Sequence, residues 1–273
     1  MLIKFKKILS SAFSQYQQPS YYKDNIIERD ELLKQIYEEI DSGTPWIESV
    51  KNPKAIKHGE RIIEYAKIAS TIKKISNTSS IIDIGCVMNN PIINYRVPDE
   101  SKIHFLNPSI ENILYPEYSY HKMPLSSWSL DLKFDLVTCL STIEHIGFDN
   151  TRYGVQETDK GWDWANCIDE VVKSIEKLLS MTKKRGTMIT SCPYGQKEFV
   201  LHPPDVGVRT AQVLHMEHVL ALSEQPFSKQ LKISTFRLDK QGWSHCAPDG
   251  NFASYGTIGP GASGIIFIEG KGL

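Results

Sequence analysis

Residues 80–90, SIIDIGCVMNN, place an acidic side chain and a glycine at the end of an apolar run. An apolar run that ends in glycine, as residues 81–85 do, is typical of a buried parallel strand followed by a tight turn. Asp83 is costly to bury in such a strand unless it is hydrogen-bonded, so we expect it to accept hydrogen bonds from the turn backbone. Open α/β folds bind ligands at the carboxyl ends of their strands, which makes this turn the first candidate site.

The residues after a later apolar run, 133–140 (KFDLVTCL), include a candidate general base. His145 follows this run by five residues, and the unperturbed pKa of a histidine, near ~6.5, suits a base at neutral pH. The alternative is that His145 is a scaffold residue that hydrogen-bonds the backbone. We expect the neighbouring Glu144 either to pair with His145 or, preferably, to be a solvated carboxylate at a helix start.

An acidic and aromatic segment comes next. Its carboxylates offer oxygen ligands for a divalent metal, but their spacing matches no metal loop, so we predict a solvated acidic loop and no metal site. Tyr153 and Trp162 either stack on a sugar ring or pack at the rim of the loop. The carboxylates are Asp149, Asp159, Asp163 and Asp169.

Strands and helices alternate along the chain, which predicts an α/β fold with a mostly parallel sheet and helices on both faces. The last two strands are joined by a loop, so the final strand is expected to be antiparallel. We predict residues 196–212 to be loop-like. Strands are expected at 81–84, 102–106, within 113–125, and at 133–140, 186–192, 231–238 and 263–269; helices at 25–40, 54–75, 166–183 and 214–224.

The order of these elements divides the chain into a helical N-terminal extension or cap, residues 1–76, and an α/β domain, residues 77–273. Residues 1–18 place apolar side chains near one helical face beside three lysines. Two interpretations stay open for this segment: an anchor at a membrane surface, or a helix that packs on its own domain or on a partner subunit. The oligomeric state is left open.

The composition is that of a globular protein with a real core. The chain has 273 residues, 41% of them hydrophobic, and a net charge of −1, so electrostatics give no reason to expect nucleic-acid binding. No apolar run approaches the ~20 residues of a membrane-spanning helix. The five cysteines contain no CxxC pair, which favours reduced thiols in a cytoplasmic protein.

Four segments in this order resemble the class I S-adenosylmethionine-dependent methyltransferases. Residues 81–86, IIDIGC, resemble the first motif of that family, and Met123-Pro124-Leu125 resembles its "LPF" segment. Residues 134–137, FDLV, followed by 143–146, IEHI, resemble the fourth-strand motif. Residues 185–190, RGTMIT, with Pro193 beyond them, resemble the fifth-strand segment. The resemblance covers residues 79–269 and implies a Rossmann-like fold.

The resemblance implies S-adenosylmethionine as the cofactor. The sequence departs from the family in three ways. Val87 and Met88 follow Gly85-Cys86 without a second glycine, the acidic residue expected after the second strand is Asn107, and the acidic residue expected just before the "LPF" segment is replaced by Ser119 or its neighbours. An asparagine carries no charge, so it cannot clasp a ribose diol as a carboxylate does. The expected cofactor-binding residues are Asp83, Gly85, Cys86, Asn107, Tyr120, His121, Met123 and Leu140.

The resemblance further implies an O-methyltransferase with His145 as its base and an acceptor lid at about residues 196–262. The acceptor is expected to be a sugar, sugar phosphate or small polar metabolite, and surface-glycan biosynthesis is one setting. Arg209 either binds a sugar phosphate bidentately or forms a surface salt bridge, and His218 is a second acceptor contact, with Tyr153 and Trp162. Two alternatives remain: a methyltransferase-like binding or scaffold subunit that does not methylate, and an enzyme of this fold that uses another nucleotide or a metal.

Overall fold

The computed structural model describes residues 20–109, 111–155, 158–201, 207–248 and 261–272. Residues 1–18, for which the sequence predicts an amphipathic helix, lie outside the described residues. Within these ranges, no helix combines the length and the hydropathy needed to cross a membrane.

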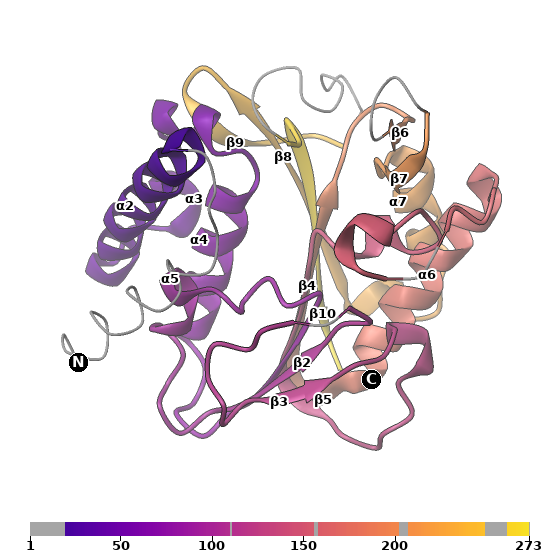
Figure 1. Ribbon diagram of the computed structural model, residues 1–273, viewed down its shortest axis with the longest axis horizontal. Helices are drawn as coiled ribbons and strands as arrows, with labels where there is room; N and C mark the ends of the chain where they lie inside the picture. The colour runs from indigo at the N-terminus through magenta and orange to yellow at the C-terminus, as the bar shows by residue number, and fades with distance from the viewer. Residues whose placement is uncertain (1–19, 110, 156–157, 202–206, 249–260, 273) are drawn as a thin grey trace.

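An eight-stranded sheet forms the centre of the molecule (Figure 1), with the strand order β3-β2-β1-β4-β5-β10-β8-β9. The first five strands are parallel, whereas β10 runs antiparallel to both of its neighbours. This arrangement confirms the predicted α/β fold and its antiparallel last strand. The strands are β1 (Ser80–Ile84), β2 (Lys102–Leu106), β3 (Ser119–His121), β4 (Phe134–Leu140), β5 (Thr182–Pro193), β8 (Leu231–Asp239), β9 (Gly242–Cys246) and β10 (Gly264–Lys271).

The chain direction across the sheet reverses between β1 and β4. From β1 the chain continues outward to β2 and β3, and it then returns to the other side of β1 to form β4 and β5. Open α/β sheets bind ligands at such a switch point, in the crevice beyond the carboxyl ends of the strands. The residues that follow β1, β2 and β4 therefore define where a ligand is expected.

Helices cover both faces of the sheet (Figure 1). The first face carries α2 (Ser20–Ser42), α3 (Trp46–Ser49), α4 (Arg61–Ile72) and α5 (Pro91–Asn94); the second carries α6 (Trp164–Met181) and α7 (Met216–Ser223). Two apolar cores result. Ile63 and Ile68 of α4 share the first core with Ile81 and Phe105 of the sheet. The helices that precede β1 thus form the layer that covers one face of the sheet.

Short 3-10 turns complete the connections: η1 (Pro53–Lys57), η2 (Leu125–Ser127), η3 (Ile143–His145), η4 (Thr151–Tyr153) and η5 (Ser228–Gln230). The predicted single helix over 54–75 is wrong, because η1 precedes α4 and Gly59, at φ 61°, lies between them. Only Gly adopts a positive φ without strain, so the helix begins at Arg61.

Two further expectations are wrong. The segment 196–212, predicted to be a loop, forms the antiparallel pair β6 (Phe199–Leu201) and β7 (Arg209–Gln212). The sequence also predicted only two strands after residue 230, whereas β8 turns back into β9 before the chain reaches β10. Strand β9 is short, polar in part and at the edge of the sheet, so its sequence lacks the apolar run of a central strand.

Candidate functional site at the carboxyl ends of the strands

Asp83 fixes the turn that follows β1. Its Oδ2 accepts a hydrogen bond from the Met88 backbone N–H at 2.7 Å, and its Oδ1 accepts one from Thr138 Oγ1 at 2.6 Å. The expectation that Asp83 accepts a bond from the turn backbone is confirmed. The carboxyl group is fully buried, and this burial raises the pKa of Asp83 to about 7.

The turn itself is tight. Gly85 has φ 89°, and a Cβ at this position would overlap the hydroxyl of Thr142, which follows β4. Cys86 also has a positive φ of 57° and is 8% exposed. Met88 is fully buried in the first core, and the Val87 carbonyl accepts a hydrogen bond from Tyr65 of α4 at 3.1 Å. The two residues that follow Gly85-Cys86 therefore pack into the protein around the turn.

A carboxylate lies beside the neutral Asn107 at the end of β2. Glu111 Oε1 accepts hydrogen bonds from Asn107 Nδ2 at 2.9 Å and from Ser109 Oγ at 3.1 Å. Tyr120 of β3 donates to the backbone carbonyls of Asn107 and Ser109 and so holds this loop. The negative charge of Glu111 contributes to the raised pKa of Cys86, after burial and Asp83, which places these side chains together.

Glu111 is the residue that the sequence reasoning missed. It follows β2 by five residues, in a loop whose sequence carries no periodic signal. Asn107 and Glu111 are four residues apart in this loop, and the hydrogen bond between their side chains places a carboxylate at the end of β2. A negative charge therefore lies beside the neutral Asn107.

The predicted cofactor residues divide between the two faces of the sheet. Asp83, Cys86, Asn107 and Tyr120 are brought together at the ends of β1 and β2. His121 instead stacks on His104, with Nδ1 of His104 3.0 Å from its Nε2, and contacts Trp128 of the second core.

Successive residues of a strand point to opposite faces, so the side chains of Tyr120 and His121 lie on opposite faces of the sheet. Met123 packs with the second core, and Leu140 is fully buried in the first.

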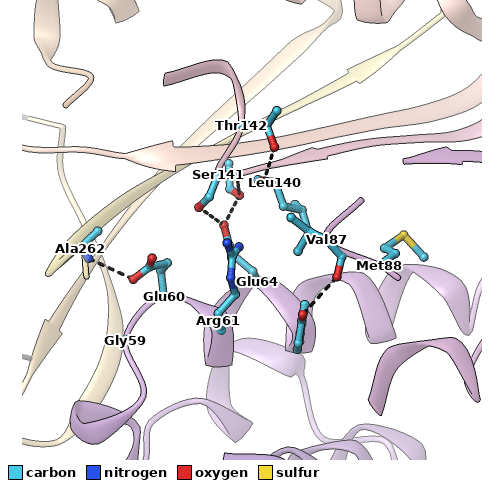
Figure 2. Close-up of polar contacts among 12 residues, drawn as sticks. Gly59, Glu60, Arg61, Glu64, Val87, Met88, Leu140, Ser141, Thr142 and Ala262 are labelled. Carbon is cyan, nitrogen blue, oxygen red and sulfur yellow. Dashed lines mark hydrogen bonds and ion pairs between the residues drawn. The ribbon is translucent and has the colours of Figure 1, made fainter. Parts of the chain in front are cut away.

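Polar side chains from α4 meet the ends of β4 and β5 (Figure 2). The fully buried Glu64 accepts hydrogen bonds from Ser141 Oγ at 2.6 Å and from Ser191 Oγ at 2.5 Å, and it pairs with Arg61. Ser141 has a φ of 41°, a conformation that non-glycine residues seldom adopt. The buried charge of Glu64 is therefore fully hydrogen-bonded, as buried charges must be.

Glu144 was expected to be solvated or paired with His145, and the expected solvation is wrong. Its side chain is 1% exposed, and its Oε2 has no hydrogen-bond partner among the residues that the structure describes. Burial raises the pKa of Glu144 to about 8, and the negative charge of Glu64 adds to this rise. At neutral pH this carboxyl group is mostly protonated.

His145 is held in a defined tautomer. Its Nδ1 lies 2.7 Å from the carbonyl oxygen of Thr210 in β7, and its ring meets that of Tyr153 edge-on at 5.5 Å. A carbonyl can only accept, so Nδ1 carries the proton of the neutral ring and Nε2 is the basic nitrogen. The same contact serves both interpretations, since it anchors the ring to the backbone and orients a base.

The residues predicted to contact the acceptor are largely occupied by neighbours. Arg209 binds Asp159 through Nε and Nη2, each at 2.7 Å, and donates from Nη1 to the Trp162 carbonyl at 2.8 Å. The Trp162 ring packs on Gly147, where a Cβ would overlap it. Tyr153 remains 45% exposed. The geometry therefore gives Arg209 the ion-pair role and leaves Tyr153 as the accessible aromatic group.

His218 is buried and helps to begin α7. Its Nδ1 accepts from the His215 backbone N–H at 3.2 Å, and its Nε2 lies 3.1 Å from Gln212 Oε1. Burial, and next the charge of His215, lower the pKa of His218 to about 3. This neutral histidine acts as a helix cap, and its contacts give it no outward-facing polar atom. In the residues that the structure describes, no group of three or more His, Cys, Asp and Glu side chains is arranged to hold a metal ion.

Comparison with known proteins gives structural likenesses only. No family model matches the chain, and no curated protein matches its sequence. Similar solved structures include a coclaurine N-methyltransferase bound to N-methylheliamine and S-adenosylhomocysteine (10% identity, 86% of this chain, 72% of that chain, TM-score 0.44). Others are the N-methyltransferase NodS from Bradyrhizobium japonicum WM9 with S-adenosylhomocysteine (8%, 77%, 85%, 0.42) and the glycopeptide N-methyltransferase MtfA with S-adenosylmethionine (11%, 77%, 93%, 0.41). At these identities, none of the likenesses identifies the residues that bind a ligand in this chain.

Proposed function

We propose that the protein is an S-adenosylmethionine-dependent methyltransferase. The observation that carries this proposal is the carboxylate of Glu111, which Asn107 and Ser109 orient beside the turn after β1. The second oxygen, Oε2, accepts no hydrogen bond within the described residues, so the carboxylate retains capacity for a ligand. A carboxylate at the end of β2 that binds ribose hydroxyls is the arrangement of nucleotide-binding α/β folds.

The residues at the switch point fit an adenosyl donor. Glu111 supplies the acceptor for a vicinal diol, and Tyr120 fixes the loop that carries it. Asp83 holds the turn in place through the Met88 N–H, so the backbone from Gly85 to Val87 is fixed at the strand end. When bound, the donor supplies an electrophilic methyl group on a sulfonium sulfur.

His145 is the group that would take the proton from the acceptor. Its Nδ1 lies 2.7 Å from the Thr210 carbonyl oxygen, so Nε2 is the basic nitrogen of the neutral ring, and proton removal by such a base makes an oxygen nucleophilic. The main contributions of the chain to such a displacement are alignment of acceptor and donor and removal of this proton. The exposed ring of Tyr153 beside His145 offers a stacking surface for the acceptor.

The finer part of the proposal is an O-methyltransferase that acts on a sugar, sugar phosphate or small polar metabolite, with surface-glycan biosynthesis as one setting. Support for it comes from a base on the acceptor side and an exposed aromatic ring next to it. The proposal includes a cytoplasmic location, which the free state of all five cysteines favours.

The test is a calorimetric titration with S-adenosylhomocysteine. Glu111→Gln keeps the shape of the side chain but removes the charge, and it should weaken binding by about tenfold or more, the usual effect of losing a charged hydrogen bond. Glu117→Gln, an exposed carboxylate of the same loop, is the matched control and should bind as the wild type does. Equal affinity of the Glu111 variant and the wild type would remove Glu111 from the site.

A second candidate is a methyltransferase-like binding subunit that performs no methylation. The observation that favours it is the space beside Gly85, which the Thr142 side chain fills, together with the burial of Met88 under the turn. If the wild-type protein gives no heat with S-adenosylhomocysteine at high micromolar concentration, this second candidate is the better account.

A further inference from the structure

Arg61 lies in the first turn of α4, where the chain direction across the sheet reverses (Figure 2). Its Nη1 donates to the buried Glu64, which Ser141 and Ser191 bind from the ends of β4 and β5. The residue after Glu64, Tyr65, donates a hydrogen bond to the Val87 carbonyl in the turn after β1. The first turn of α4 is therefore fixed against the ends of three central strands at once.

The guanidinium group of Arg61 retains unused hydrogen-bonding capacity. The side chain is 31% exposed, and its Nε and Nη2 make no hydrogen bond within the described residues. Its positive charge opposes the rise in pKa of both Asp83, which lies in β1, and Glu144, which follows β4. A planar guanidinium with two free donor nitrogens matches the geometry of a carboxylate.

Glu111 and Arg61 lie on opposite sides of the turn formed by residues 85–88. Glu111 is at the β2 side, next to Cys86, whereas Arg61 is at the β4 side, next to Ser141 through Glu64. A ligand that spans the turn would meet a negative charge at one end and a positive charge at the other. An adenosyl donor matches this arrangement, because its ribose diol can donate hydrogen bonds to a carboxylate and its amino-acid carboxylate, which lies beyond the sulfur, can accept them from a guanidinium.

We propose that Arg61 binds the α-carboxylate of the donor's amino-acid end, so that the helical N-terminal segment contributes a ligand-binding residue. This inference rests on the proposed function. Glu64 is then a positioning residue: it holds Nη1 and leaves the remaining nitrogens of the fork directed to the ligand. The helices before β1 belong to the donor site in this account.

The test compares two ligands that differ only at this end. S-adenosylhomocysteine carries the carboxylate, and 5′-methylthioadenosine lacks the whole amino-acid group. Both are titrated calorimetrically into the wild type, Arg61→Met, Arg61→Lys and the control Arg96→Met, whose arginine pairs with Asp41 of α2 instead. Thermal unfolding without ligand is measured for each variant.

The proposal predicts that Arg61→Met lowers the affinity for S-adenosylhomocysteine by about tenfold or more and changes the affinity for 5′-methylthioadenosine by less than about twofold. Arg61→Lys keeps the charge but loses the fork, so its affinity for S-adenosylhomocysteine should lie between those of the wild type and Arg61→Met. This variant also provides the test if Arg61→Met does not fold. Arg96→Met should bind both ligands as the wild type does. Equal weakening of the two ligands by the Arg61 variants, or no weakening, would overturn the inference. If the wild type binds neither ligand, the proposed function itself fails.

Discussion

The donor side and the acceptor side of the strand ends use their polar side chains differently. On the donor side, neighbours bind only some of the polar atoms of Glu111 and Arg61. The other polar atoms of these two side chains make no hydrogen bond within the described residues. On the acceptor side, Arg209 uses both edges of its guanidinium to bind Asp159 and the Trp162 carbonyl. His218 uses one ring nitrogen in the cap of α7 and the other in a contact with Gln212. Unused hydrogen-bonding capacity at the carboxyl edge of the sheet, rather than residue type and chain position alone, therefore distinguishes the residues that we propose to bind the donor.

The largest effect is expected at the turn that both sides share. Gly85→Ala should lower the free energy of unfolding by roughly 3 kcal/mol, because the new Cβ meets Thr142 and the residue keeps a positive φ. Chemical denaturation measures the change. Gly154→Ala is the control: its φ of 74° is also positive, but no atom of the described residues lies within 4 Å, so only about 1 kcal/mol should be lost. Similar losses in both variants would show that the contact with Thr142 is unimportant.

The next effect separates binding from turnover. His145→Ala should reduce kcat by about 100-fold, the usual contribution of a general base, while the affinity for S-adenosylhomocysteine stays within a few-fold of the wild type. The measurement requires an acceptor, found by screening sugars and sugar phosphates for methyl transfer. A variant with wild-type kcat would make His145 a scaffold residue of the Thr210 contact.

Glu144 predicts a pH dependence of stability. Its pKa rises from 4.5 to about 8 on folding, so the folded state binds more protons between these values. Stability from this group is complete below pH 4.5 and is lost as the pH rises toward 8, at about 1.4 kcal/mol per unit.

Replacing Glu144 by Gln should therefore make the unfolding free energy less dependent on pH between 5 and 8. Parallel pH profiles of the variant and the wild type, followed by chemical denaturation, would contradict the buried and protonated state of Glu144.

The smallest effect is expected on the acceptor side. Asp159→Asn should lower the free energy of unfolding by only about 1 kcal/mol, because the pair with Arg209 is partly exposed and screened by solvent. Donor affinity should not change, since the pair lies away from Glu111 and Arg61. A loss of donor affinity in calorimetry would show that the two sides are coupled, contrary to the comparison drawn above.

Much of the fold was predictable because buried strands leave a continuous apolar signal. The prediction for β2 matches its bounds, since KIHFL is limited by polar residues on both sides. Strand β9 was missed because it is an edge strand that turns back on β8, and its sequence includes glycine, serine and histidine. The long predicted helix failed because periodicity alone does not register the positive φ of Gly59.

The site was predictable only where a residue's role depends on its own strand. Asp83 and the turn at Gly85 follow directly from the apolar run that precedes them. Arg61 and Glu64 were not among the predicted site residues because their contacts join segments far apart in sequence, such as that of Glu64 with Ser191. Glu111 was not among them because its loop carries no periodic signal, although its contacts with Asn107 and Ser109 are local. Glu144 was wrongly predicted to be solvated because its position suggested a helix start, whereas the fold buries its side chain beside Cys192.

A crystal structure with S-adenosylhomocysteine tests the central claim most directly. The account predicts that the ribose hydroxyls lie within hydrogen-bond distance of the Glu111 carboxylate and that the amino-acid carboxylate meets Arg61. A ligand bound elsewhere, or crystals that remain free of ligand at saturating concentration while Val87 and Met88 keep the turn closed, would contradict it.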